Sequence, residues 1–176
     1  MPRLLFVSGS LRAASSSRAV IRALIDRIGT RADCIIADPG ALPHYNADVQ
    51  DDPTVAAFIG EVEQADGVVF VTPEYNYSVP GVLKNAIDWA SRPAYASVFL
   101  DKPCFVITVS GGVMGGVRAQ AHLKYILNGM LAQTFACKEV VVPQSNATVT
   151  DGVFKNDDVL DFALANLADF MATLDS

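Results

Sequence analysis

Three loops carry the side chains in this sequence that are best suited to binding a ligand, and the first is rich in hydrogen-bond donors. Residues 9–18 read Gly-Ser-Leu-Arg-Ala-Ala-Ser-Ser-Ser-Arg and directly follow a short apolar run. A phosphate needs donors, and serine hydroxyls, an arginine and the free N–H groups of a following helix all supply them. A helix cap alone would need only one serine. We therefore predict a phosphate site whose donors are Ser10, Arg12, Ser15, Ser16 and Ser17.

The second loop, residues 73–78, combines a carboxyl group, an amide and two aromatic rings. It reads Pro-Glu-Tyr-Asn-Tyr-Ser and follows a run of apolar residues. Tyr75, Asn76 and Tyr77 can offer a planar ligand both hydrogen bonds and ring surface. The alternative is that the two tyrosines are ordinary surface aromatics and Asn76 an ordinary turn residue. Glu74 has the chemistry of a general acid or base, or of a carboxylate that fixes the loop. We interpret it as a positioning residue.

The third loop, residues 110–116, reads Ser-Gly-Gly-Val-Met-Gly-Gly. Glycine has no side chain, so main-chain N–H groups in such a loop can approach the edge of a flat ring closely. The alternative is that the glycines only make a mobile connection. A phosphate contact at the first loop and ring contacts at the second and third describe a ligand with one phosphate, a polar stem and a planar head. FMN fits this outline, and other mononucleotides fit it as well.

These loops need a scaffold, and strand-like and helix-like segments alternate along the chain to provide one. Short apolar runs predict strands at residues 3–8, 33–37, 67–72, 103–109 and 139–143. Apolar residues at helical spacing predict helices at residues 17–28, 80–91, 117–133 and 157–174, and a further helix that begins at Asp52 and Pro53. All three loops follow predicted strands, and the carboxyl ends of strands are where open α/β sheets bind ligands.

The third predicted strand, residues 67–72, is apolar at nearly every position, which is typical of a parallel sheet covered by helices on both faces. Five strand–helix units without an internal repeat or a low-complexity linker predict one α/β domain over residues 1–176. We expect a flavodoxin-like three-layer α/β/α sandwich with a five-stranded parallel sheet. Sequence alone does not separate the two common strand orders of such sheets, but the length favours the flavodoxin-like order.

Composition narrows the classes of partner. The net charge of -6 disfavours a nucleic-acid backbone, which basic patches bind. Three widely separated cysteines and two histidines show no metal-binding spacing, so we expect no metal site. No segment approaches the roughly 20 consecutive apolar residues of a membrane span, and no signal region is visible. We expect a soluble cytoplasmic protein.

Beyond these patterns, the chain resembles the NADPH-dependent FMN reductase family, a flavodoxin-like group that includes quinone, chromate and azo-dye reductases. The first resembling motif is Gly-Ser-Leu-Arg at residues 9–12, with Ser15 and Arg18. The second is Pro-Glu-Tyr-Asn at residues 73–76, followed by Pro-Gly-Val-Leu-Lys-Asn-Ala-Ile-Asp-Trp at residues 80–89. The third is Ser-Gly-Gly at residues 110–112. The motifs stand in the family's order and spacing, and the similarity runs over most of the chain.

The resemblance implies an FMN site and gives residues to it. Its phosphate contacts would be Ser10, Arg12, Ser15 and Ser17. The residues around the ribityl chain and the ring would be Pro73, Glu74, Tyr75 and Asn76. The residues at the ring edge would be Ser110 and Gly111. No side chain is implied as catalytic, because the N5 atom of the flavin carries the chemistry.

The resemblance also implies a ping-pong NAD(P)H oxidoreductase, in which hydride passes from NADPH or NADH to FMN and then to a quinone, azo compound, metal ion or flavin. It implies a homodimer or homotetramer with the flavin near the subunit interface. The alternative is a flavodoxin-type electron carrier without direct NAD(P)H oxidation, and the moderate net charge favours the enzyme. A receiver-like regulator would need acidic residues after the first strand, where this chain has Ser8, Gly9 and Ser10.

Overall fold

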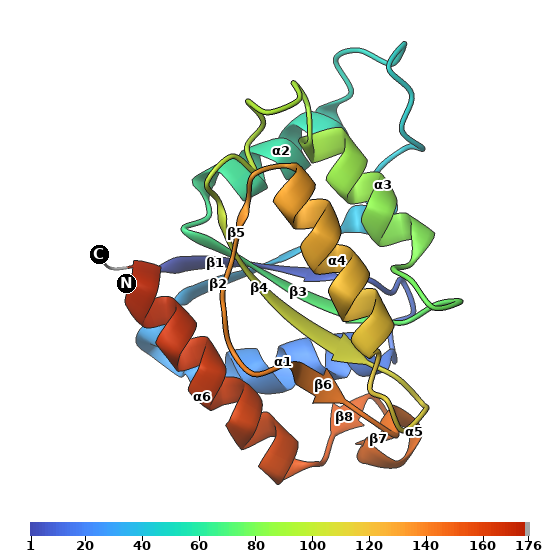
Figure 1. Cartoon of the computed structure of the whole chain (residues 1–176), viewed down its shortest axis with the longest axis vertical. Coiled ribbons are helices and arrows are strands. Elements are labelled where there is room, and N and C mark those ends of the chain that lie inside the picture. Colours follow the sequence, from blue (N-terminus) through green and yellow to red (C-terminus); the bar gives the residue numbers. More distant parts are fainter. Residues whose placement is uncertain (175–176) are drawn as a thin grey trace.

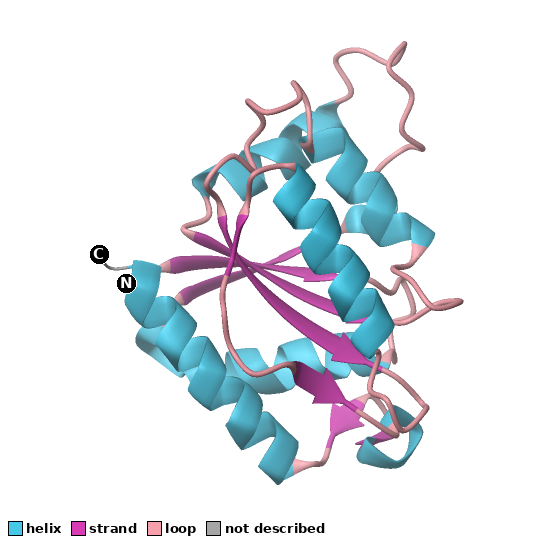
Figure 2. Ribbon diagram, in the orientation of Figure 1, coloured by secondary structure: helices cyan, strands magenta, loops and turns pink. Residues whose placement is uncertain are grey.

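The structure, a computed structural model, describes residues 1–174 and has a parallel β-sheet at its centre (Figures 1 and 2). The last two residues of the predicted domain, 175–176, lie outside the described residues. The strands run in the order β2-β1-β3-β4-β5, which is the flavodoxin-like order, and β6 also pairs with β4. Their bounds are β1 Arg3–Ser8, β2 Asp33–Ala37, β3 Gly67–Pro73, β4 Pro103–Val109, β5 Gln133–Thr134 and β6 Val140–Val142.

Helices cover both faces of the sheet and complete the predicted three layers. Figure 1 shows α1 and α6 on one face and α2, α3 and α4 on the other. The helices are α1 Ser16–Ile28, α2 Pro53–Gln64, α3 Gly81–Ala90, α4 Val117–Gly129, α5 Ser145–Thr148 and α6 Asp157–Leu174, with short 3-10 turns at Gly29–Arg31 and Pro39–Ala41. The fold class predicted from the sequence is therefore confirmed.

Alternation along the strands explains why both faces are apolar. In β1, Leu4 and Phe6 pack with α1 and α6, whereas Leu5 and Val7 pack with the helices of the opposite face. All four side chains are buried. A strand whose successive side chains enter two separate cores has to be apolar throughout, because neighbouring side chains point to opposite faces.

The fifth strand position of the sheet is divided between two short strands. β5 pairs with Pro103 and Cys104 of β4, and β6 pairs with Ile107–Val109 further along the same strand. The predicted helix 117–133 was too long, because α4 ends at Gly129 and Leu131 has a left-handed backbone (φ 62°) that an α-helix cannot contain. The predicted sheet of five strand positions is therefore present, but β5 and β6 share the fifth position.

Some structure around the site has no clear sequence signal. The short helix α5 and a two-stranded antiparallel hairpin, β7 Val149–Thr150 with β8 Val153–Phe154, follow β6 and were not predicted.

Within residues 1–174, no helix combines the length and the apolar character needed to cross a membrane. In the same range, no group of three or more His, Cys, Asp and Glu side chains is placed to hold a metal ion.

Candidate functional site

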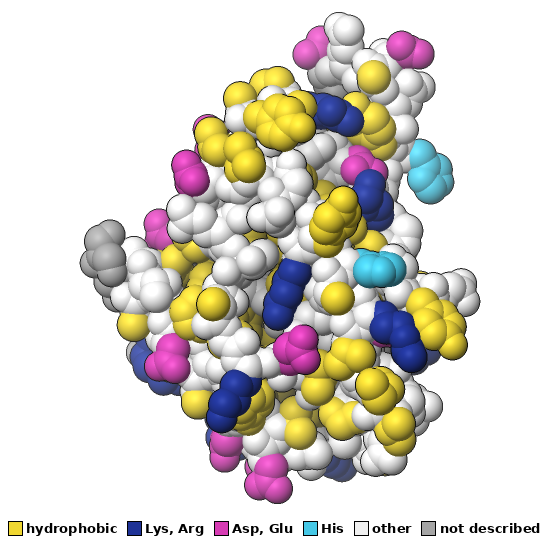
Figure 3. Space-filling view, in the orientation of Figure 1, with side chains coloured by type: hydrophobic (Ala, Val, Ile, Leu, Met, Phe, Trp, Pro, Cys, Tyr) yellow, Lys and Arg dark blue, Asp and Glu magenta, His cyan; other side chains and the backbone are white. Residues whose placement is uncertain are grey.

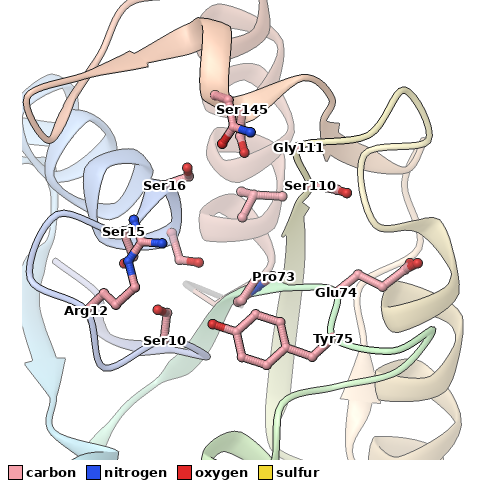
Figure 4. A pocket seen from close by; sticks show the side chains of 13 residues that line it. Ser10, Arg12, Ser15, Ser16, Pro73, Glu74, Tyr75, Ser110, Gly111 and Ser145 are labelled. Carbon is pink, nitrogen blue, oxygen red and sulfur yellow. The ribbon is translucent and has the colours of Figure 1, made fainter.

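A cavity of about 160 Å³ lies at the carboxyl ends of β1, β3 and β4 (Figure 4). All three loops singled out in the sequence contribute to it, together with the segment after β6. Its lining residues are Ser10, Arg12, Ser15, Ser16, Ser17, Pro73, Glu74, Tyr75, Val109, Ser110, Gly111, Ser145 and Asn146. The topology explains the meeting point, because parallel strands all end at the same edge of a sheet.

Nine of the ten residues that the resemblance gives to the site line this cavity, and Asn76 is the exception. Ser16, predicted from the first loop, lines it as well. Asn76 and Tyr77 are the central residues of a tight turn, with φ values of 48° and 68°. The turn is closed by two backbone hydrogen bonds between Tyr75 and Ser78, of 2.9 and 3.0 Å. Positive φ at both central positions matches a type I′ turn, in which Asn is favoured. The structural contribution of Asn76 is therefore to the shape of the loop.

The N-terminus of α1 forms one side of the cavity and is rich in donors (Figure 4). Ser15 is its N-cap, and the Ser15 Oγ atom accepts a hydrogen bond from the N–H of Arg18 at 3.2 Å. Ser17 is buried, and its hydroxyl has no partner among the described residues. An unpaired buried hydroxyl costs stability. A ligand oxygen at this helix end would satisfy it and would also meet the positive end of the helix dipole.

The first loop is held in place by close packing on β3. The N–H of Gly9 donates to the carbonyl of Val71 at 3.0 Å. A Cβ atom at Gly9 would lie 2.0 Å from the Oγ1 atom of Thr72, which is far inside contact distance. Arg18 adds a side-chain bond of 3.2 Å from its Nε atom to the carbonyl of Ser10. Glycine at position 9 is therefore required for the loop to turn over the end of β3.

Glu74 is turned toward α4 and away from the centre of the cavity (Figure 4). Its carboxylate accepts hydrogen bonds from the backbone N–H groups of Arg118 at 3.1 Å and Ala119 at 3.2 Å. The Nη1 atom of Arg118 lies 3.4 Å from the other carboxylate oxygen. The N-cap residue Gly116 offers no side chain, so Glu74 caps α4 from another part of the chain. This geometry agrees with its interpretation as a positioning residue.

The two tyrosines of the second loop have different environments. The ring of Tyr75 projects into the cavity, with its hydroxyl on the side of Ser10 (Figure 4). Tyr77 lies outside the cavity lining and is 65% exposed, and the guanidinium of Arg118 stacks over its ring at 4.5 Å. Only Tyr75 is therefore placed to contact a ligand in the cavity, and the sequence alone did not distinguish the two rings.

The glycine-rich loop is a packed structure. Gly115 and Gly116 have φ values of 62° and 89°, which strain other residues. A Cβ atom at Gly115 would lie 2.7 Å from the side chain of Val141. Ser110 folds back so that its Oγ atom accepts from the N–H of Gly112 at 3.1 Å. Gly115 and Gly116 are therefore explained by local geometry and close contacts.

Ser145 and Asn146 line the cavity but were not identified from the sequence. They follow β6, so they occupy the same type of position, after the end of a parallel strand, as the three predicted loops. Their position after a predicted strand was the one sequence signal that could have indicated them. It was weak because the segment has neither the several hydroxyls of the first loop nor the glycines of the third.

Comparison with known proteins gives consistent matches. The model of the family described as NADPH-dependent FMN reductase matches residues 2–147. An NAD(P)H-dependent FMN reductase of Pseudomonas aeruginosa is 42% identical over 128 residues, which are 71% of this chain and 69% of that protein. A quinone reductase of Escherichia coli K12 is 48% identical over 125 residues, which are 68% of this chain and 65% of that protein.

A solved structure extends the likeness to nearly the whole chain. The flavoenzyme NAD(P)H:(acceptor) oxidoreductase of Paracoccus denitrificans superposes with a TM-score of 0.88 at 31% sequence identity. The superposition covers 99% of this chain and 98% of that one. It therefore includes the C-terminal residues that follow the part matched by the family model.

Proposed function

Because this chain belongs to the NADPH-dependent FMN reductase family, we propose that its cavity binds FMN and that the protein is an NAD(P)H oxidoreductase that reduces quinones. The observation that carries the proposal is the meeting of three loops at one cavity, with donors on one side and the Tyr75 ring and the glycine loop on the other. The names of the relatives in Escherichia coli and Pseudomonas aeruginosa support the quinone acceptor and the FMN cofactor.

The residues present fit a flavin mononucleotide. The hydroxyl of Ser17 is buried without a partner beside the N-terminus of α1, and a phosphate there would give it an acceptor. Arg12 is the one cationic side chain among the thirteen residues of the lining and would offset part of the phosphate charge. Gly111 brings main chain without a side chain to the wall of the cavity, where a flat ring can approach it closely.

Each of the ten site residues that the resemblance gives has a role in this proposal. The phosphate contacts are Ser10, Arg12, Ser15 and Ser17. Pro73 and Tyr75 flank the polar stem and the ring, and Ser110 and Gly111 approach the ring edge. Glu74 positions α4, and Asn76 shapes the turn that presents Tyr75.

When bound, FMN supplies the redox chemistry, taking two electrons from NAD(P)H and giving them to the acceptor. The protein's task is to bind and orient the reactants. Glu74, the one carboxylate in the cavity lining, is already held by two backbone N–H groups of α4. We therefore propose no proton-transfer role for it.

The competing function is that of a flavodoxin-type carrier, which would dock its partners through a strongly acidic face. Figure 3 shows one face of the molecule, on which acidic side chains lie scattered among basic and apolar ones. Scattered charges give the face shown little electrostatic steering, and the moderate net charge of -6 also favours an enzyme. We further propose a single domain over residues 1–176 that works in the cytoplasm as a homodimer or homotetramer, with the flavin near the subunit interface.

The test is spectroscopic. Purified protein is saturated with FMN, freed of excess cofactor and mixed with NADPH or NADH in the absence of oxygen. Bleaching of the visible flavin bands, followed by their return when a benzoquinone is added, is the expected result. Protein that retains no FMN would contradict the proposal. If dithionite bleaches the flavin bands but neither NADPH nor NADH does, the protein is a flavodoxin-type electron carrier instead.

A further inference from the structure

We propose that Ser145 and Asn146 form a fourth wall of the cavity beside α1 and bind the phosphate end of the mononucleotide. This inference rests on the FMN site proposed above, and it adds residues that neither the sequence motifs nor the resemblance indicated. Both residues belong to the segment after β6, and both line the same cavity as Arg12 and the serines of α1.

The backbone of this segment is fixed by the glycine-rich loop. The N–H of Gln144 donates to the carbonyl of Gly112 at 3.0 Å, and the N–H of Ser145 donates to the carbonyl of Ser110 at 2.9 Å. Gln144 has a left-handed backbone, with φ at 49°, and this sharp turn directs the chain from β6 back over the loop. Because the backbone makes these contacts, the two side chains are available to face the cavity.

The side chains lie where the phosphate would need additional donors. In Figure 4, Ser145 lies toward the side of Ser16, and Tyr75 lies on the opposite side of the cavity. Phosphate oxygens point in several directions, whereas the free N–H groups of α1 all point along one helix axis. One of those groups, the N–H of Arg18, is already used by Ser15. Phosphate oxygens that are not directed at these N–H groups would therefore meet the Ser145 hydroxyl and the Asn146 amide.

Gly111 makes room for the amide. A Cβ atom at Gly111 would lie 3.0 Å from the Nδ2 atom of Asn146, which is tighter than ordinary van der Waals contact. The glycine next to Ser110 thus allows the Asn146 side chain to approach the cavity. Ser145 is 5% exposed, so its hydroxyl belongs to the wall of the cavity and not to the outer surface.

The test compares FMN with riboflavin, which has the same ring and ribityl chain but no phosphate. Apo-protein is titrated with each flavin by fluorescence, for the parent and for Asn146→Ala, Ser145→Ala and Asn146→Asp. We expect Asn146→Ala and Ser145→Ala each to raise the Kd of FMN by roughly 5-fold and that of riboflavin by less than about 2-fold. Asn146→Asp should raise the Kd of FMN by at least about 10-fold, because like charges would then face each other.

Gln144→Glu is the matched control, since it adds the same charge two residues away on an exposed side chain outside the cavity lining. Its effect on FMN should stay below that of Asn146→Asp. Equal losses for FMN and riboflavin, or no loss in any variant, would overturn the inference while leaving the proposed function intact. A parent protein that binds no FMN would overturn the proposed function itself. Circular dichroism of each variant separates lost binding from lost folding, and Ser145→Ala and Asn146→Ala provide two independent small changes.

Discussion

Glu74 and Arg118 lie 44 residues apart in the sequence, yet the carboxylate of Glu74 meets both the backbone N–H of Arg118 at 3.1 Å and its guanidinium at 3.4 Å. Arg118 in turn stacks over Tyr77. The loop after β3 and the helix after β4 are therefore joined at the edge of the cavity. A displacement of one changes the position of the other, so Glu74 influences the cavity through α4.

Replacing Glu74 with Ala should lower the free energy of unfolding by about 1–2 kcal/mol, because the first turn of α4 loses its cap. Glu74→Gln should cost less, since the amide oxygen still accepts a hydrogen bond. Urea denaturation measures the free energy of unfolding of both variants. Hydrogen exchange at the backbone N–H groups of Arg118 and Ala119 should become faster in Glu74→Ala. Glu63→Ala removes an exposed carboxylate from α2 and serves as the control. A similar loss in both alanine variants would contradict the capping role.

Replacing Arg12 with Ala should weaken FMN binding by roughly 10-fold, because one charge-assisted contact to the phosphate is lost. Riboflavin should bind both proteins about equally. Fluorescence titration of the apo-protein measures both constants. Arg22→Ala is the control, since Arg22 donates to the carbonyl of Gly152 and lies outside the cavity lining. Unchanged FMN affinity in the Arg12 variant would remove this residue from the phosphate site.

Replacing Ser17 with Ala should change stability and affinity in opposite directions. The apo-protein should be unchanged or stabilised by up to about 1 kcal/mol, because a buried hydroxyl without a partner disappears. FMN should bind several-fold more weakly. Ser8→Ala is the matched control, since the buried Ser8 hydroxyl is paired with both the N–H and the carbonyl of Ser10, and its loss should destabilise the apo-protein. Destabilisation by Ser17→Ala would show that this hydroxyl is already satisfied.

Cys104 should make the fold less stable in alkaline solution. Burial raises the pKa of this thiol from its ordinary value of 9.0 to about 12. Between these values the unfolded chain loses the proton and the folded chain keeps it, so stability falls as the pH rises above about 9. One proton corresponds to at most about 1.4 kcal/mol per pH unit.

Nearby Lys102 changes stability with pH in the opposite direction. Burial lowers the pKa of its amine below 10.5, so the folded chain releases a proton at a lower pH than the unfolded chain does. This contribution makes the fold more stable as the pH rises. The contribution of Cys104 is therefore measured as a difference between two proteins. Urea denaturation at pH 8 and pH 10.5 should show a smaller alkaline loss for Cys104→Ala than for the parent. Parallel losses in the two proteins would contradict the raised pKa.

Sequence patterns predicted the buried elements well, because their signals are local. The bounds of β2, β4 and α6 match the predicted residues 33–37, 103–109 and 157–174. β2 and β4 are apolar runs too short for a helix, and the apolar residues of α6 recur at helical spacing. The end of α4 was wrong because the sequence from Met130 to Gln133 continues to allow a helix, whereas the structure uses Gln133 to pair with β4.

The candidate site was predictable where a loop followed a strong strand signal, and less so where side-chain direction mattered. Residues such as Ser10 and Gly111 line the cavity as expected, because their backbone positions already place them there. Asn76 lies in a turn with two positive φ values that moves it out of the cavity lining, which agrees with the alternative of an ordinary turn residue. The role of Glu74 depends on α4, an element that lies far away in the sequence.

The interrupted fifth strand position also affects how the protein behaves in concentrated solution. A long edge strand presents a row of free N–H and C=O groups that a strand of another molecule can join. Here that edge consists of β5 with two residues and β6 with three, separated by a segment that leaves the sheet. The interruption therefore leaves only short templates at this edge of the sheet, whereas β2 forms the other edge. A variant that straightened residues 133–142 into one strand would gain hydrogen bonds to β4 and would also create a template for fibril growth.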